Sequence, residues 1–198
     1  MKTFFSPVAC FAVLLFSSAG TVQVIVQKTS GVYLTAANFK NGQVSFEGDC
    51  GSKTHKLELH DVLHKSYVHV THGTEKHRFA KSDLFGFRAC DGRDYRFASN
   101  LEYHILEAKE LYVYSREVPV SHGRGIHTVR GYFFSAGPEG TVLALTLENL
   151  KQAFPGNHRF HDALDAMVGA GQQLAEYDES QKMFRVNRLL VASREEER

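Results

Sequence analysis

An alternation of apolar and polar residues runs through most of the chain from Lys56 to Thr146, and it limits the possible folds more than any other feature. Successive side chains of a β-strand point to opposite faces, so this period of two indicates strands with one face buried. Turn signals separate the runs at intervals that leave no room for helices. The segment therefore predicts an antiparallel sheet of meanders and hairpins, and a sheet of this length could curl strongly.

The turn Asp91-Gly92 poses a question of register in this sheet. Phe87 precedes the turn and Tyr95 follows it, each on the apolar face of its own strand. A two-residue loop would pair Phe87 with Arg96 and put the aromatic rings on opposite faces. A loop of odd length or a β-bulge brings the rings onto one face, and we predict a bulge at this position.

A helical pattern replaces the alternation at Thr146. Thr146 can cap a helix that ends near Phe154, because Pro155-Gly156 follows. Asn157 can cap a second helix, and residues 179–192 predict a third. Helices that follow a run of antiparallel strands predict an α+β fold, with the helices packed on one face or one end of the sheet.

These patterns also predict the domain organisation. We expect one α+β domain over residues 20–193, which is mostly β in residues 20–145 and helical in residues 146–193. Residues 117–125 are polar and contain proline and glycine, which predicts a linker between two strands. Residues 194–198 are charged and predict a flexible tail.

Residues 1–19 have the composition of a secretory signal peptide. Lys2 gives a positive start, residues 8–16 are apolar, and the small residues Ser17 and Ala19 precede a cleavage position. The apolar stretch is shorter than the about 20 residues that a spanning helix needs, and no later stretch is long and apolar enough. We therefore expect an exported protein of the periplasm, the cell surface or the medium, without a membrane span after cleavage.

The cysteines and the charges narrow the possible chemistry. Cleavage would remove Cys10 and leave Cys50 and Cys90, which can form a disulfide in an oxidising compartment or remain free thiols. Their spacing matches no compact metal motif. The chain has 23 Lys and Arg residues against 22 Asp and Glu residues, so no field of one sign attracts nucleic acid. Nucleic acid is therefore excluded as an expected partner.

Histidines are concentrated in the β part of the chain, where six of the 11 lie between residues 55 and 77. Strand parity places His60 and His69 on the faces opposite the apolar residues of their strands, so both should point outward. Imidazole is the commonest metal ligand in proteins, and two such rings on neighbouring strands could bind zinc or another divalent metal. They could also be ordinary polar surface residues or a pH-sensitive surface, and the sequence leaves these readings open.

Two further groups of residues are weaker candidates. His158 and His161 lie near the start of the second predicted helix, and each has an acidic residue four positions later. These carboxylates could assist a metal half-site, or they could only stabilise the N-terminus of the helix. His122 and Arg124 lie in the predicted linker between glycines, which could cradle an anion or form a mobile hairpin loop. No Gly-x-Ser-x-Gly elbow or phosphate-binding loop is present.

Three parts of the chain carry a family resemblance: Gly31-Val-Tyr-Leu-Thr-x-x-Asn-Phe39, Leu84-Phe-Gly-Phe-Arg-x-Cys-Asp-Gly-Arg-Asp-Tyr-Arg-Phe97, and Leu145-Thr-x-x-Asn-Leu-Lys-x-x-Phe154 with Asn187-x-Leu-Leu190. They resemble small exported proteins of Bacteroidota that have no assigned activity. The resemblance implies a one-domain protein of a Gram-negative envelope and assigns no catalytic residue.

The sequence favours one functional class and keeps a second. Without a catalytic signature, an exported antiparallel scaffold is expected to be a non-enzymatic binding or interaction module, whose partner is an envelope protein or a small ligand. No cofactor is expected in that case. The alternative is a metal-dependent or hydrolytic enzyme that uses the histidine-rich strands or the helix with His158 and His161.

Overall fold

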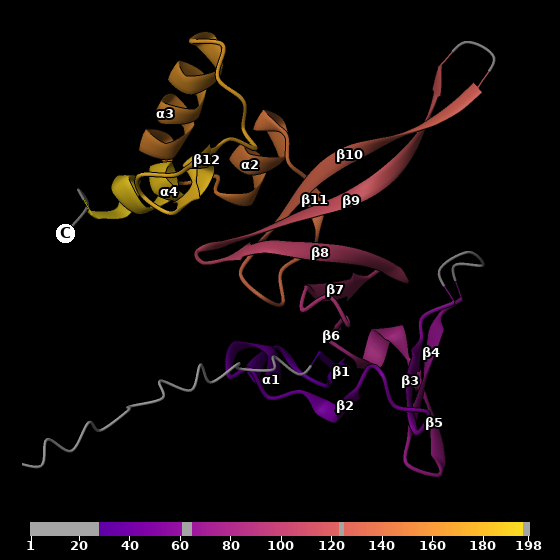
Figure 1. The fold of residues 1–198 in the computed structure, drawn as a ribbon. Coiled ribbons are helices and arrows are strands. Elements are labelled where there is room, and N and C mark those ends of the chain that lie inside the picture. The colour runs from indigo at the N-terminus through magenta and orange to yellow at the C-terminus, as the bar shows by residue number, and fades with distance from the viewer. Residues whose placement is uncertain (1–27, 61–64, 123–124, 196–198) are drawn as a thin grey trace, which may run out of the picture.

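The computed structural model describes residues 28–60, 65–122 and 125–195, so the predicted signal peptide lies outside the described residues. An eight-stranded antiparallel sheet is the centre of the fold (Figure 1). Its strands, in spatial order, are β11 (Leu143–Ala144), β10 (Gly125–Ala136), β9 (Leu111–His122), β8 (Leu101–Ala108), β7 (Asp94–Ala98), β6 (Gly86–Arg88), β1 (Thr29–Tyr33) and β2 (Ser45–Asp49). The antiparallel sheet that the alternation predicts is confirmed. The described sheet is extended, so the strong curl that its length suggested is not found.

A three-stranded sheet, called the small sheet below, packs beside β1 and β2. It consists of β3 (His55–Glu58), β4 (Tyr67–His72) and β5 (Glu75–Ala80), and the 3-10 turn η2 (Lys81–Asp83) follows it. Val68 and Val70 of β4 are fully buried and pack in one apolar cluster with Val32 and Phe87 of the large sheet. Burial of this apolar surface holds the two sheets together.

A disulfide between Cys50 and Cys90 closes the segment that contains the small sheet. The two Cα atoms lie 5.8 Å apart, which is within the ordinary range for a disulfide. Of the two alternatives that the sequence left open, the structure contains the disulfide. The bridge ties the start of the small sheet's segment to the loop between β6 and β7.

The loop between β6 and β7 resolves the question of register. Ala89 N–H donates to Arg93 O at 2.8 Å, so three residues form the loop, and Gly92 adopts a φ of +83°. This is the geometry of a three-residue hairpin with a glycine in the left-handed region. Phe87 then pairs with Tyr95, and their rings stack with centroids 4.8 Å apart. The aromatic residues share one face, as predicted. Of the two connections that allow this, the structure has the loop of odd length, and the bulge that we predicted is not present in the pairing of β6 with β7.

Four helices complete the described part of the fold, and three of them lie in the C-terminal part of the chain: α1 (Ala36–Lys40), α2 (Leu147–Ala153), α3 (His158–Gly169) and α4 (Arg185–Glu195). The hydroxyl of Thr146 accepts from Asn149 N–H, and the Asn157 side chain accepts from Phe160 N–H. Both predicted N-caps are therefore confirmed. Helices α2 to α4 pack on Leu111, Val113 and Phe134 of β9 and β10, at one end of the large sheet (Figure 1).

The third helix begins later than its pattern predicts. A short hairpin of β12 (Tyr177–Asp178) and β13 (Met183–Phe184) occupies the first part of the range 179–192. The Asp178 carboxylate accepts from the backbone N–H groups of Ser180 and Gln181, so a side-chain turn replaces the first helical hydrogen bonds. The helix ends at Glu195, inside the range 194–198 that predicts a tail.

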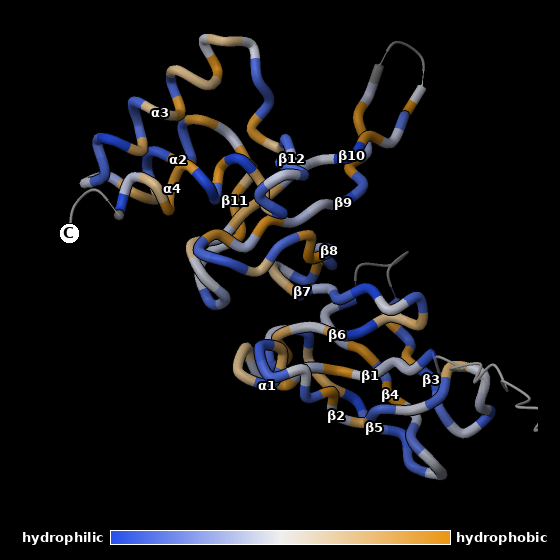
Figure 2. The backbone as a smooth tube through the Cα atoms, turned by 60° about the vertical axis from the view of Figure 1, so that its left-hand side comes forward, coloured by the Kyte–Doolittle hydropathy of each residue, from blue (hydrophilic) through white to orange (hydrophobic). Residues whose placement is uncertain are grey.

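The linker predicted over residues 117–125 is wrong, because β9 runs to His122 and β10 begins at Gly125. Ser115 is the last residue of β9 that pairs with β8. Beyond Ser115, β9 pairs only with β10, so Pro119 lies where the side of β9 that faced β8 no longer needs an N–H donor. Beyond that point the two strands form a projecting arm (Figure 1), along which hydrophobic and hydrophilic residues alternate (Figure 2). On this arm Ile126 is 77% exposed.

Candidate metal-binding site

Strand parity divides the histidines of the small sheet into two groups. His55, His72 and His77 lie on the face of the buried valines, where His55 is buried, His77 is half-buried and His72 is exposed at the strand end; the rings of the last two contact Phe46. His69 lies on the opposite face of β4, between the buried valines in sequence. The outward orientation predicted for His69 is confirmed, and the other three histidines lie on the opposite face.

His60 meets His69 on the outward face. Its Nε2 atom lies 3.0 Å from Nδ1 of His69, so one ring donates a hydrogen bond to the other. His60 follows the end of β3 and has a φ of +58°, a left-handed conformation that costs about 1 kcal/mol for a residue with a Cβ. Backbone strain of this kind is found preferentially at functional sites. The structure therefore brings together the two histidines that the sequence singled out.

Glu58 supplies a third ligand group that the sequence analysis did not select. It pairs with His69 across β3 and β4, and its Oε2 atom lies 3.8 Å from Nδ1 of His69. Ligand atoms of Glu58, His60 and His69 all lie within 4.8 Å of one another, and all three residues are half-buried. We call these three residues the Glu58 site. The sequence alone could have indicated Glu58, because it lies two residues before His60 and residues two apart in an extended strand point to the same face.

Two lysines set the charge of Glu58. Lys56 Nζ lies 2.8 Å from Oε1, and Lys76 Nζ lies 3.1 Å from Oε2. Hydrogen bonds from these ammonium groups lower the pKa of Glu58 to about 2. Burial, followed by the charge of Lys76, lowers the pKa of His69. Near neutral pH the site therefore holds an ionised carboxylate and a neutral His69 ring, which are the forms that bind metal.

The geometry of the Glu58 site fits a tetrahedral zinc ion. Zinc–imidazole bonds of about 2.0–2.1 Å place two tetrahedral nitrogen ligands about 3.3 Å apart. The His60 and His69 nitrogens lie 3.0 Å apart, so they need to separate by only about 0.3 Å. Two histidines and one carboxylate would leave one position of the metal open. This spacing makes the three residues a candidate site for a divalent ion.

In the second histidine pair, a ligand atom of His161 is already engaged. His161 Nε2 donates to the carbonyl oxygen of Phe154 at 2.9 Å, which joins the start of α3 to the end of α2. Asp165, a possible helper, accepts from Lys151 through both oxygens, at 2.6 and 2.7 Å. The rings of His158 and His161 are 6.0 Å apart between centroids. The structure thus gives His161 a role in joining two helices, whereas His158 is exposed.

The remaining sequence candidates do not form a site among the described residues. Arg124 and the side chain of His122 lie outside the described part of the chain.

A Ser–His pair does exist, since Ser30 Oγ lies 2.8 Å from His55 Nε2 beside a cavity of about 230 Å³. However, His55 Nδ1 has no hydrogen-bond partner, so the orienting carboxylate of a catalytic triad is missing here.

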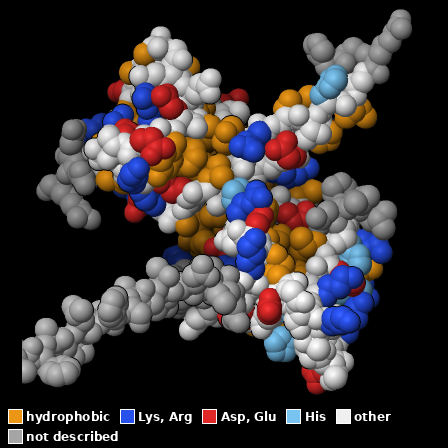
Figure 3. Space-filling view, in the orientation of Figure 1, with side chains coloured by type: hydrophobic (Ala, Val, Ile, Leu, Met, Phe, Trp, Pro, Cys, Tyr) orange, Lys and Arg blue, Asp and Glu red, His pale blue; other side chains and the backbone are white. Residues whose placement is uncertain are grey.

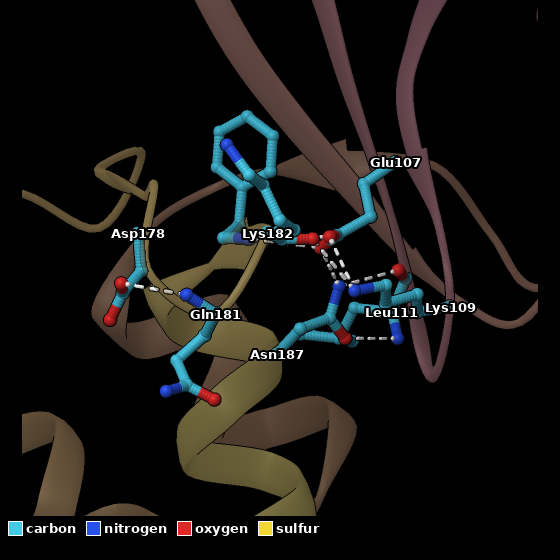
Figure 4. Close-up of polar contacts among 8 residues, drawn as sticks. Glu107, Lys109, Leu111, Asp178, Gln181, Lys182 and Asn187 are labelled. Atoms are coloured by element: carbon cyan, nitrogen blue, oxygen red, sulfur yellow. Dashed lines mark hydrogen bonds and ion pairs between the residues drawn. The ribbon is translucent and has the colours of Figure 1, made fainter.

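A buried polar cluster joins α4 to the edge of β8 (Figure 4). Glu107 accepts from the Asn187 side chain and from the backbone N–H of Phe184, and Lys109 lies 3.4 Å away. Asn187 also accepts from Leu111 N–H at 2.7 Å and donates to Leu111 O at 2.9 Å. Because the carboxylate and the amide are satisfied by these contacts, the cluster fastens the helix to the sheet.

Comparison with known proteins finds no matching family model, no matching curated protein and no matching solved structure. Within the described residues, no helix has the length and apolar composition needed to cross a membrane. The function of this chain is therefore inferred from the chemistry of its own residues.

Proposed function

We propose that this protein is an exported, non-enzymatic binding module of the cell envelope, and that its Glu58 site binds zinc or a similar divalent ion. One observation carries the proposal: ligand atoms of Glu58, His60 and His69 lie within 4.8 Å of one another. Two histidines and a carboxylate form the donor set of known zinc sites with one open position.

Two features support an exported binding module. The Cys50–Cys90 disulfide closes the segment that carries the site, and disulfides persist mainly in oxidising compartments. The sequence of residues 1–19 and the resemblance to exported Bacteroidota proteins agree with this location and stay predictions. The cavity beside the disulfide is lined by Leu57 and Leu59 but not by the ligand residues, whereas catalytic sites are usually concave. Binding is therefore favoured over catalysis.

Calorimetric titration of the metal-free protein with zinc chloride tests the proposal. We expect one zinc ion per chain in wild type, and at least about 100-fold weaker binding in His69→Ala, because the ring is a direct ligand. Glu58→Gln should weaken binding about 10-fold or more, since the charged ligand oxygen is lost. His158→Ala serves as the matched control and should bind like wild type.

Two results would overturn the proposal. One is the absence of stoichiometric zinc binding by folded wild-type protein. The other is zinc binding that His158→Ala abolishes and that a His60→Ala, His69→Ala double variant retains. Circular dichroism of each variant confirms that the loss of a ligand, and not unfolding, explains the result.

A further inference from the structure

The outward face of the small sheet is basic around the Glu58 site. Strand register places Lys56 of β3 and Lys76 and Arg78 of β5 on the same face as Glu58 and His69. Glu58 is the one acidic residue among the outward-facing residues of these three described strands. Lys and Arg side chains gather with histidine over β4 and β5 in the space-filling view (Figure 3). An anion approaching this face meets an excess of positive charge.

Metal binding would release one of the lysines. Lys76 Nζ contacts the same carboxylate oxygen, Oε2 of Glu58, that lies nearest to His69 Nδ1. A divalent ion bound between these ligand atoms would repel the ammonium group and take its place on Oε2. Lys76 is half exposed and lies on β5, next to the strand that carries His69, so its freed Nζ stays beside the metal. The exchange leaves a positively charged hydrogen-bond donor next to the open metal position.

The third cation is held in place by stacking. The Arg78 guanidinium lies over the Tyr67 ring, 3.9 Å from its centroid, and Arg78 pairs with His69 across β4 and β5. Cation–π contact fixes the charge near the site without neutralising it. With a divalent ion added, Lys56, Lys76 and Arg78 face a single carboxylate, and the local charge favours a ligand with more than one negative charge.

We propose that the metal-loaded Glu58 site binds a small phosphate-class oxyanion, an inference that rests on the metal binding proposed above. One oxygen would take the open position of the metal. The other oxygens would accept hydrogen bonds from the ammonium groups of Lys56 and Lys76. Phosphate fits this arrangement better than a carboxylate, because it carries a charge of about −1.5 to −2 and offers three strong acceptor oxygens.

Titration of the cobalt-loaded protein with inorganic phosphate tests the inference, because the visible bands of cobalt report a change of ligand at the open position. We expect phosphate to shift these bands in wild type, with an affinity at least about 10-fold above that of acetate. A Lys56→Gln, Lys76→Gln double variant should bind phosphate at least about 10-fold more weakly. The exposed Lys40→Gln variant, far from the site in the fold, is the matched control and should behave like wild type.

The double lysine variant separates this inference from the proposed function. Removing the ammonium groups frees the Glu58 oxygens, so cobalt affinity should rise while phosphate affinity falls. Cobalt binding with no spectral response to phosphate would overturn the oxyanion site and leave the metal site standing. Failure of wild type to bind cobalt or zinc would overturn the metal site itself. Equal phosphate affinity in wild type and the double variant would also refute the inference.

Discussion

The two histidine pairs of this protein look alike in sequence and differ in what their nitrogens contact. On the small sheet, the nearest partner of His60 Nε2 is the ring of His69, at 3.0 Å. On α3, His161 Nε2 already donates to the Phe154 carbonyl oxygen. The nearby carboxylates do not differ in this way, because lysines contact both oxygens of Glu58 and both oxygens of Asp165. Glu58 differs in having a histidine nitrogen nearby, since its Oε2 atom lies 3.8 Å from Nδ1 of His69.

This difference teaches that residue type and spacing do not identify a metal site. A ligand must also have a lone pair that no stronger backbone or side-chain partner uses. The end of α2 presents carbonyl oxygens outside the helical ladder, and Phe154 O accepts from both Asn157 N–H and His161 Nε2. The outward face of a three-stranded sheet provides no such groups, because the strand ladders consume the backbone. Histidines on that face are left to contact each other.

The disulfide gives the largest expected difference between the two regions. It closes a 40-residue segment that contains the whole small sheet and no part of α3. A Cys50→Ser, Cys90→Ser variant should lose about 4 kcal/mol of unfolding free energy, because the unfolded chain gains the freedom of that loop. Hydrogen exchange should show lost protection mainly in β3 to β5 and little change in α2 to α4.

Denaturant unfolding of both proteins measures this loss, and thiol counting on denatured, unreduced wild type is its control. Reactive thiols at both Cys50 and Cys90 in wild type, or a loss below about 1 kcal/mol, would contradict the presence of a stabilising disulfide. Equal loss of protection in α3 and in the small sheet would show that the disulfide does not stabilise the small sheet selectively.

The smallest effects are expected for substitutions of the two histidines on α3. Loss of the hydrogen bond to Phe154 O in His161→Ala should reduce stability by about 1 kcal/mol, with or without zinc. His158→Ala, at an exposed position, should change stability by less than about 0.5 kcal/mol. Thermal unfolding with and without zinc measures both variants. A stabilisation by zinc that disappears in His161→Ala would move the metal to α3.

The sequence predicted the parts of the fold that local chemistry controls. Strand alternation and the caps at Thr146 and Asn157 depend on neighbouring residues, and they are confirmed. Near Gly92 the structure has a loop of odd length where we predicted a bulge. The linker over residues 117–125 was wrong because proline and glycine suggest a loop. Whether Pro119 disrupts a strand depends on where β8 ends, and that is a property of the assembled sheet.

The candidate site was predicted only in part for the same reason. Parity alone indicates that His60 and His69 point outward, and this brought both into consideration. Three facts came from the assembled structure: the register that places Glu58 opposite His69, the left-handed backbone of His60, and the engagement of His161 by Phe154. Each depends on contacts between residues that a single strand or helix does not contain.

X-ray absorption spectroscopy of the zinc-loaded protein tests the central claim most directly. The account predicts a four-coordinate zinc with two imidazole nitrogens, further oxygen ligands and no sulfur, at bond lengths of about 2.0–2.1 Å. The imidazole signal should fall in His69→Ala and persist in His161→Ala. A six-oxygen shell without imidazole, or an unchanged imidazole signal in His69→Ala, would contradict it.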